Sequence, residues 1–401
     1  MLRKFYVHNF KTLLNLTFEP KGLNLLIGRN NVGKTNLCQA MEFLSRTASE
    51  ELSRAAVGAT GMAHGLQNKH SNDSASAFGC ECELTLQGGT YLFTYRLAVH
   101  FPGLARVPGG PRLIEEALRV SGQGFSDVAL IRNEGGQAKF LNESAYLAGD
   151  TERSLVDAGG APTHVTMVER LLSESPATHL AYHFKSFLES WSFLDLDNGR
   201  LRDTRSAGPD APLQRDGGNL ASVVQFLKMR DDRAYREVVD LVRLVEPRLE
   251  AINFLPSPDP SLVFMVFEDS EGKQFHPPAL SNGTLRLLAL AHTIAESAGA
   301  VQRRSSLPRL IVIEEPETGI FVRTLKDVFR ALDPSGRFGQ YVFTSHQPYF
   351  IDLFDGSLDG VFFLKREPSH TVLIKPDPDQ VRKLLGQFSL GELHFREMLG
   401  S

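Results

Sequence analysis

The chain has 401 residues, 42% of them hydrophobic and 22% charged, and a formal net charge of −4 at pH 7. It is long enough to bury the core of two or three domains, and its charge excludes a generally basic surface, so a nucleic-acid site would have to be a local patch. No apolar stretch approaches the roughly 20 residues that span a bilayer, and the first residues lack the apolar core of a signal peptide. We therefore expect a cytoplasmic protein with no membrane contact.

The N-terminal residues read as strands around a glycine-rich loop. "KFYVHNF" and "LLNLTF" alternate as a hairpin does, and "LNLLI" is a short apolar run that leads into "GRNNVGKTN". Leu37, Met41 and Leu44 follow at helical spacing, so the predicted order is strand, loop, helix. Residues 45–77 read as a loop-rich connection, and "FGCECELTL", "TYLFTYRLAVH" and "IEEALRV" as strands of one antiparallel sheet.

The three cysteines, Cys38, Cys80 and Cys82, are too few for a disulfide framework or a four-ligand zinc site. Two of them lie in "GCECEL", which reads as a strand with both thiols on one face. We expect all three to be reduced thiols in a reducing compartment.

The rest of the chain changes character twice. Residues 121–248 begin with Gly-rich loops and continue with helical stretches, without the sustained heptads of a coiled coil. After the strand "SLVFMVFED", helices and strands alternate to the end. We predict one α/β nucleotide-binding core in two halves, residues 1–120 with an antiparallel β subdomain and residues 249–401, interrupted by a mainly helical insertion lobe at residues 121–248.

"GRNNVGKT" fits the phosphate-binding pattern G-x-x-x-x-G-K-[ST]. Glycines let backbone N–H groups turn toward phosphates, Lys34 reaches the β- and γ-phosphates, and the Thr35 hydroxyl can ligate Mg²⁺ at a helix N-terminus. The predicted nucleotide-binding residues of this loop are Gly28, Asn30, Asn31, Val32, Gly33, Lys34, Thr35 and Asn36.

"RLIVIEEPETGI" is an apolar strand that ends in two carboxylates. At the carboxyl end of a parallel strand, Glu314 would hold Mg²⁺, directly or through water, and Glu315 would orient or deprotonate the attacking water. "YVFTSH" ends the following strand, so His346 is expected beside them, in reach of a γ-phosphate or of that water.

"ALSNGTLRLLALAHTIA" starts a helix with a clear apolar stripe. Either Ser281 or Asn282 is its expected N-cap. The exposed N–H groups and the Ser281 hydroxyl could also form a second phosphate-binding helix end.

In this order, "GRNNVGKT", "LSNGT", "IVIEEPE" and "FTSH" resemble the motifs of the ABC-type ATPases of the RecF/SMC/OLD group. The opening "VHNFKTLLNLTFEPKGLNLLIGRNNVGKTN" is similar to that group's start, and "LQRDGGNLASVVQFL" resembles a segment of its stand-alone ATPases. The resemblance covers roughly residues 1–45 and 213–354. It implies an ABC-type ATPase head that hydrolyses ATP with Mg²⁺.

The resemblance also implies that two copies pair head to tail, with each ATP held between one copy's phosphate loop and the other's Ser281 and Gly283. Asn282 stands in place of the usual first glycine of that segment, Glu314 in place of the commoner Asp, and "GIFVRT" in place of a His-Pro after the acidic strand. The first two departures are expected to preserve ATP binding and to slow turnover. Gln67 is a weak candidate for the glutamine that senses Mg²⁺ in this group.

Several other patterns carry competing interpretations. "LDLDNG" has the Asp-x-Asp spacing of a nuclease, but Asp195 and Asp197 are better read as solvated loop carboxylates. His179 and His183 stand at i, i+4 without the Glu of H-E-x-x-H, which favours a structural or surface pair over a metal site. A run of arginines could contact DNA or an acidic partner, although Asp residues lie among them; these are Arg200, Arg202, Arg205 and Arg215.

From these features we expect an ATP-gated dimeric switch that supplies the ATPase and sensor of a bacterial anti-phage or DNA-surveillance system. Its effector, plausibly a nuclease, would be encoded separately, because a nuclease domain is not apparent after the ATPase motifs. A RecF-like DNA-binding ATPase of recombination or repair is the alternative. A transporter's nucleotide-binding subunit fits the chain less well.

Overall fold

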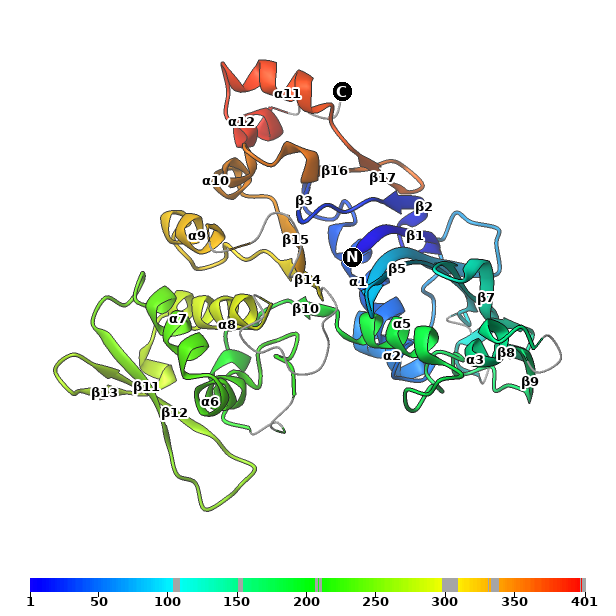
Figure 1. The fold of residues 1–401 in the computed structure, drawn as a ribbon. Helices are drawn as coiled ribbons and strands as arrows, with labels where there is room; N and C mark the ends of the chain where they lie inside the picture. The colour runs from blue at the N-terminus through cyan, green and yellow to red at the C-terminus, as the bar shows by residue number, and fades with distance from the viewer. Residues whose placement is uncertain are drawn as a thin grey trace.

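The computed structural model describes residues 1–103, 109–150, 154–205, 208, 211–297, 309–330, 332, 339–396 and 398. Two large sheets and a small third one organise this part of the chain (Figure 1). Among its helices, none has both the length and the apolar character that crossing a membrane requires.

The core sheet has six strands in the order β10-β14-β15-β3-β16-β17, all parallel except β17. Its strands are β3 (Leu23–Ile27), β10 (Ser192–Leu194), β14 (Arg309–Glu314), β15 (Gly339–Ser345), β16 (Val361–Arg366) and β17 (Thr371–Ile374). Leu194 pairs with Ile313, Glu314 with Thr344, and Ser345 with Ile27. The carboxyl ends of β10, β14, β15 and β3 therefore meet at one edge, which is where ligands bind in open α/β sheets.

Both faces of the core sheet are buried, which explains why its strands are continuously apolar. Leu310 and Val312 belong to one hydrophobic cluster, and Ile311 and Ile313 to the other. On the first face lie α1 (Lys34–Arg46), α2 (Leu52–Thr60) and α5 (His179–Glu189). On the second face lie α8 (Asn282–Ser297), α9 (Val322–Phe329) and α10 (Pro348–Ile351).

The second sheet is antiparallel, with eight strands in the order β2-β1-β4-β5-β6-β7-β8-β9. They are β1 (Leu2–Phe10), β2 (Leu13–Phe18), β4 (Ser76–Leu86), β5 (Gly89–His100), β6 (Arg112–Gly122), β7 (Phe125–Glu134), β8 (Gln137–Leu141) and β9 (Leu155–Gly160). The two predicted hairpins are present as β1–β2 and β4–β5, and the predicted strand "IEEALRV" lies in β6. Cys80 and Cys82 are both buried, which agrees with the prediction that they share one face of a strand, and burial raises the pKa of the Cys82 thiol to about 12.

The region predicted to be mainly helical differs from the structure in its first part. Residues 121–160 complete β6 and form β7, β8 and β9, with the short helix α3 (Glu143–Leu147) between β8 and β9. They join the antiparallel sheet because each strand pairs with the one before it in the chain. A helix, α2, also lies within the connection at residues 45–77 that was expected to be a loop.

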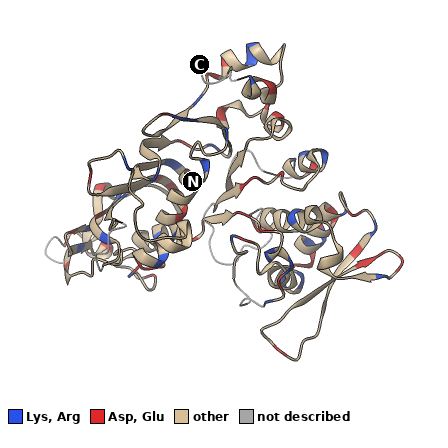
Figure 2. Cartoon of the chain, turned by 180° about the vertical axis from the view of Figure 1, so that it is seen from behind, with Lys and Arg blue, Asp and Glu red and all other residues tan. Residues whose placement is uncertain are grey.

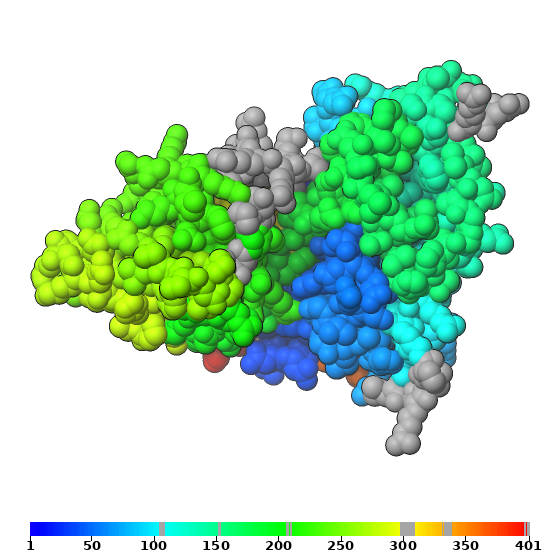
Figure 3. Space-filling view, turned by 90° about the horizontal axis from the view of Figure 1, so that it is seen from below, coloured from blue at the N-terminus to red at the C-terminus, as the bar shows by residue number. Residues whose placement is uncertain are grey.

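The helical part of the insertion contains α6 (Leu220–Arg230) and α7 (Asp232–Val242), which are separate because the Asp231 side chain caps α7. They pack with α8 and with a three-stranded sheet of β11 (Leu249–Leu255), β12 (Phe264–Asp269) and β13 (Gln274–Phe275). Seen from below, this part and the antiparallel sheet form two bodies on opposite sides of the molecule (Figure 3).

The C-terminal helices α11 (Pro378–Leu385) and α12 (Leu390–Phe395) return to the core. Leu390 and Leu393 are fully buried, and the Gly391 N–H donates to the Asp352 carboxylate at 2.7 Å, just after α10. A capping box formed by Ser389 and Glu392 starts α12. The described C-terminal residues therefore dock on the core.

Candidate functional site

The phosphate loop connects β3 to α1 at the edge where the parallel strands end. Gly33 precedes α1 with a φ of 109°, and a Cβ there would lie 2.5 Å from the Thr371 hydroxyl, so only glycine fits. α1 has no side-chain N-cap bond and no acidic residue in its first turn. Its first N–H groups are therefore available to an anion.

Lys34 lies folded over the loop, with 7% of its surface exposed. Its Nζ donates to the carbonyls of Gly28 at 2.6 Å and Arg29 at 3.1 Å. Burial lowers the pKa of Lys34, while Glu315 and the neighbouring carboxylates oppose the shift. A phosphate would offer this ammonium group a stronger acceptor than the two carbonyls.

Two threonines from distant segments fasten the loop. The Thr371 hydroxyl donates to the Val32 carbonyl at 2.8 Å, and the Asn36 amide donates to the Thr12 hydroxyl at 2.8 Å. Asn30 and Asn31 stay exposed at the tip of the loop, Asn31 with a φ of 64°. Thr12 and Thr371 were not among the sequence candidates, because their roles depend on contacts outside the motif.

The predicted metal ligands are adjacent. The Thr35 hydroxyl donates to Oε2 of Glu314 at 2.6 Å. Burial raises the pKa of Glu314, and the hydrogen bond from Thr35 and the charge of Arg215 work against that rise. Two oxygen ligands on converging elements fit Mg²⁺, which binds one or two protein oxygens and keeps several waters.

Arg215 links three carboxylates beside this pair. Its guanidinium lies 2.8 Å from Glu42, 3.1 Å from Glu314 and 3.3 Å from Asp195. Burial lowers the pKa of Arg215, but the three carboxylates outweigh it and the net shift is upward. The sequence singled out Arg215 only as a member of a basic run, so its place beside Glu314 is new.

Asp195 reaches the site because β10 pairs in parallel with β14 and ends directly before it. The sequence missed this arrangement because β10 has three residues, too few to show a strand pattern. Gln67, the candidate Mg²⁺ sensor, instead donates its amide to the Ser74 carbonyl at 3.0 Å, within its own loop.

The predicted catalytic pair is also in contact. Nδ1 of His346 lies 3.1 Å from Oε1 of Glu315, across the neighbouring ends of β14 and β15. Glu315 has a φ of 45°, in the left-handed region that a residue with a side chain rarely adopts. Its N–H donates to the Thr344 carbonyl at 3.1 Å, which holds this conformation.

Glu317 is a further carboxylate at this edge that had no assigned role. Its Oε1 accepts a hydrogen bond from Ser345 at 2.5 Å, and its buried Oε2 has no hydrogen-bond partner among the residues that the structure describes. Burial raises the pKa of Glu317, and Ser345 opposes that shift. A buried carboxylate oxygen without a partner is expected to need a donor, such as a bound water or ligand.

The N-terminus of α8 agrees with one sequence prediction. Oγ of Ser281 accepts a hydrogen bond from the Thr284 N–H at 3.1 Å, so Ser281 caps the helix. Ser281 and Asn282 are exposed. A Cβ on Gly283 would lie 2.2 Å from the Gly319 carbonyl, so this glycine is also required for packing against the loop after β14.

Most of the predicted arginine run is engaged within the chain. Arg200 pairs with Asp203 at 2.7 Å and with Asp216 at 2.9 Å. Arg202 donates to the Asn198 and Leu280 carbonyls, and Asp197 accepts from the N–H groups of Gly199 and Arg200. Arg205 is the exposed member of the run, with 77% of its side chain accessible. The four arginines therefore do not form a basic patch.

Two family models match the chain. Residues 175–352 match the model described as "AAA domain, putative AbiEii toxin, Type IV TA system", and residues 1–83 match the model described as "AAA ATPase domain". The first match contains the segments from α5 to α10, and the second contains the phosphate loop. No curated protein of similar sequence matches the chain.

Solved structures of SMC heads are similar to the chain at low sequence identity. An SMC head bound to the C-winged helix domain of ScpA is 12% identical with a TM-score of 0.55, and the match covers 95% of this chain and 99% of that one. The SMC head domain of Pyrococcus furiosus bound to the C-terminal domain of ScpA is 11% identical, with a TM-score of 0.49 and coverage of 96% and 98%. The SMC head domain of Thermotoga maritima has a TM-score of 0.45 at 11% identity, with coverage of 94% and 99%.

The comparison with solved structures supports the architecture of the chain, and the two family models support its relationship to AAA ATPases in sequence. Together with the phosphate loop at the centre of the core sheet, they agree with the expected α/β head and its antiparallel subdomain. Residues 175–352 and 1–83 thus resemble AAA-type ATPase domains, and the chain has the ABC-type ATPase head fold seen in an SMC head.

Proposed function

We propose that this chain binds and hydrolyses ATP with Mg²⁺ and that ATP binding joins two copies head to tail, so that the protein acts as a switch. The observation that carries the proposal is the meeting of Lys34, the Thr35–Glu314 pair and the Glu315–His346 pair at one sheet edge. These groups come from three strand ends far apart in the sequence. The combination matches the needs of phosphoryl transfer to water.

Each group has a defined task in this proposal. The N–H groups of residues 28–36 and the Lys34 ammonium bind the phosphates, and Thr35 and Glu314 hold the metal ion. Mg²⁺, when bound, neutralises charge on the β- and γ-phosphates. Glu315 orients the attacking water and accepts its proton, and His346 donates a hydrogen bond to the γ-phosphate or to that water.

Exposed side chains near the carboxyl ends of the parallel strands support the pairing of two copies. Ser281 and Asn282 are exposed at the start of α8. Phe321, after β14, and Tyr349, after β15, are 74% and 72% exposed. Large exposed aromatic side chains beside a predicted nucleotide site are typical of a surface that a second protein covers. In the proposed dimer, Ser281 and Gly283 of one copy contact the γ-phosphate bound by the other.

The biological setting that we propose is anti-phage defence or DNA surveillance, with the chain as ATPase and sensor and a separately encoded effector, such as a nuclease. It is supported by the model match over residues 175–352, whose description names an AbiEii toxin and a type IV toxin–antitoxin system. The similar SMC head with a TM-score of 0.55 is bound to the C-winged helix domain of ScpA, so a head of this fold can bind a second protein.

A RecF-like role on DNA has less support. Basic and acidic residues are interspersed along the ribbon (Figure 2), and three of the four arginines in the predicted run contact partners within the chain. DNA binding by the protein alone, with an affinity that falls steeply as salt rises, would favour this role over the two-component switch.

The test is the mass in solution of a hydrolysis-deficient chain, Glu315→Gln, with and without ATP and Mg²⁺, alone and with the product of the neighbouring gene. We expect a monomer without ATP, a dimer with ATP, and capture of the neighbouring protein by the dimer. If the chain binds ATP but remains a monomer whether or not ATP is present, the head-to-tail switch is contradicted. A dimer that ignores the neighbour would retain the switch and remove the proposed effector.

A further inference from the structure

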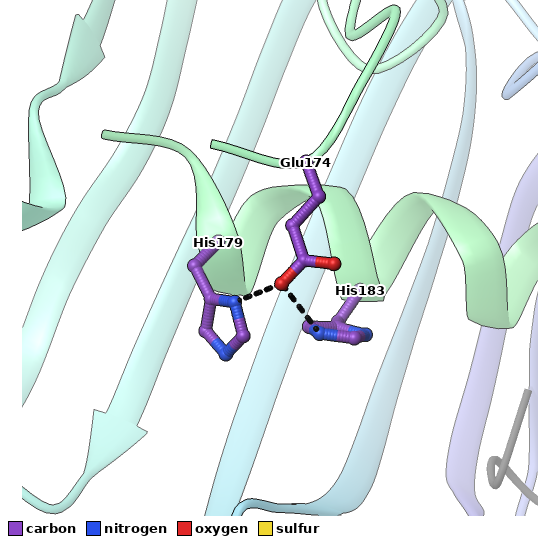
Figure 4. A group of neighbouring side chains, drawn as sticks. All are labelled: Glu174, His179 and His183. Carbon is purple, nitrogen blue, oxygen red and sulfur yellow. Dashed lines mark hydrogen bonds and ion pairs between the residues drawn. The ribbon is translucent and has the colours of Figure 1, made fainter. Parts of the chain in front are cut away.

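Glu174, His179 and His183 form a side-chain cluster away from the nucleotide site, at the start of α5 (Figure 4). Oε1 of Glu174 lies 2.6 Å from Nδ1 of His179 and 3.5 Å from Nε2 of His183. The carboxylate comes from the segment before α5 and lies between the two imidazole rings, whose centroids are 4.5 Å apart. Within the described part of the chain, it is the one such group of three or more metal-ligating side chains.

The ligand atoms are close enough to share one metal ion. All three lie within 4.8 Å of one another. A tetrahedral zinc site with ligands at about 2.0–2.2 Å has ligand atoms about 3.3–3.6 Å apart, and these values lie within the range of the separations found here. Small side-chain rotations would therefore convert the cluster from a hydrogen-bonded group to a coordination site.

The backbone that carries the cluster is held by other residues. The carboxylate of Glu143 accepts hydrogen bonds from the N–H groups of Leu180 and Ala181, at 2.7 and 3.1 Å. Glu174 is therefore not needed to cap α5. Lys185 donates to the carbonyls of Glu169 and Leu171, both at 2.7 Å, which fixes the segment leading to Glu174.

α5 itself is firmly packed, so the two histidines have a rigid base. Phe184 is fully buried, and its ring lies 5.7 Å from that of Phe93 and 5.1 Å from that of Tyr95. His179 and His183, one turn apart, keep 22% and 26% of their side chains exposed, and Glu174 keeps 49%. The buried face of α5 thus holds the cluster in place. The three side chains remain partly exposed to solvent, which leaves room for a water ligand.

We propose that Glu174, His179 and His183 bind one Zn²⁺, with a water as the fourth ligand. Two imidazoles and one carboxylate suit zinc, whereas Mg²⁺ and Ca²⁺ take oxygen ligands almost alone. The sequence argued against a metal here because the helix lacks H-E-x-x-H, but the carboxylate comes from outside the helix.

The site has a structural role in this proposal. It ties the segment carrying Glu174 to the first turns of α5, and α5 continues into β10 at the edge of the core sheet. The other end of the helix is linked to α1 by the Ser45 hydroxyl, which donates to the Leu188 carbonyl at 2.8 Å. The inference does not depend on ATP binding or hydrolysis.

The test uses the full chain after chelator treatment and dialysis, with Zn²⁺ and Co²⁺ as probes. We compare the wild type with His179→Ala, His183→Ala and Glu174→Gln by equilibrium dialysis with metal analysis. The wild type should bind one more Zn²⁺ per chain than either histidine variant, and Glu174→Gln should bind it at least about tenfold more weakly. Bound Co²⁺ should give the visible absorption of a tetrahedral site in the wild type alone.

His8→Ala is the matched control, because His8 also contacts a carboxylate, Asp73 at 2.7 Å, but belongs to no group of three metal-ligating side chains among the described residues. It should retain the extra Zn²⁺. Far-UV circular dichroism checks that each variant is folded. Equal zinc binding by the wild type and both histidine variants would overturn the site, and an unchanged affinity in Glu174→Gln would overturn the three-ligand assignment.

Discussion

The hydroxyl of Thr35, in the first turn of α1, lies 2.6 Å from a carboxylate oxygen of Glu314 at the end of β14, although 279 positions separate them in the chain. The contact exists because β3 and β14 flank β15 in one parallel sheet. It brings the phosphate loop and the acidic strand together. The predictions below test what this edge of the sheet does.

Replacing Lys34 by alanine should weaken ATP binding about 100-fold or more, because a buried ammonium that contacts phosphate contributes a charge-assisted hydrogen bond. Equilibrium dialysis with ATP measures the loss. Lys21→Ala, an exposed lysine just before β3, is the control and should bind ATP as the wild type does. Normal binding by Lys34→Ala would show that the phosphate-loop assignment is wrong.

Glu315→Gln should bind ATP normally and hydrolyse it at least about 100-fold more slowly, because the amide cannot accept the proton of the attacking water. Phosphate release under saturating ATP measures the rate. Glu271→Gln, in a turn with 57% of its side chain exposed, should keep the full rate. If Glu315→Gln also keeps it, the proton acceptor lies elsewhere, and Glu317 becomes the first residue to test.

Ser281→Arg should prevent ATP-driven pairing without preventing ATP binding, because a long cation at the exposed start of α8 would collide with the partner's phosphate site. Sedimentation velocity with and without ATP separates the two effects. Gly283 is a poor position for this test, since any side chain there collides with Gly319 in the same chain. Ser270→Arg, at an exposed turn, should pair normally. Dimers of Ser281→Arg would contradict the head-to-tail arrangement.

Arg215→Ala should lower the free energy of unfolding by about 3 kcal/mol, because it leaves the buried carboxylate of Glu314 without its paired cation, whereas Glu42 keeps its ion pair with Arg46. Denaturant titration measures the change. The control comes from the same run: Arg205→Ala removes an exposed side chain that lies 4.0 Å from Asp203 and should change stability by less than about 1 kcal/mol. Equal effects of the two substitutions would mean that the position beside Glu314 is unimportant for stability.

Stability should also depend on pH through Glu116, whose pKa is raised to about 7 by burial, against hydrogen bonds from Met167, Val168 and Tyr95. A raised carboxyl pKa means that the folded state binds the proton that the unfolded state has lost. Stability therefore falls as pH rises from about 4.5 to about 7, by about 3 kcal/mol for this group. Urea titrations across that range should give a steeper decline for the wild type than for Glu116→Gln. Parallel curves of stability against pH for the two proteins would exclude Glu116 as the source of the pH dependence.

Local sequence determined the parts of the site that are built from neighbouring residues. The loop from Gly28 to Lys34 and the carboxylates after β14 follow from a glycine pattern and an apolar run. The capping of α8 by Ser281 follows from the same kind of short-range rule. Their order along the chain was also sufficient to predict the α/β class and the family resemblance, since each motif requires only a few adjacent positions.

Only the tertiary structure decided the contacts between distant segments. Arg215 beside Glu314, Asp195 at the end of the three-residue strand β10, and Glu174 between His179 and His183 depend on pairing and packing that leave no periodic signal. The strands of residues 121–160 also depend on long-range pairing, because each of them pairs with the preceding strand at the edge of the antiparallel sheet. Composition and spacing therefore determined the chemistry that this chain carries, and long-range packing decided which side chains act together.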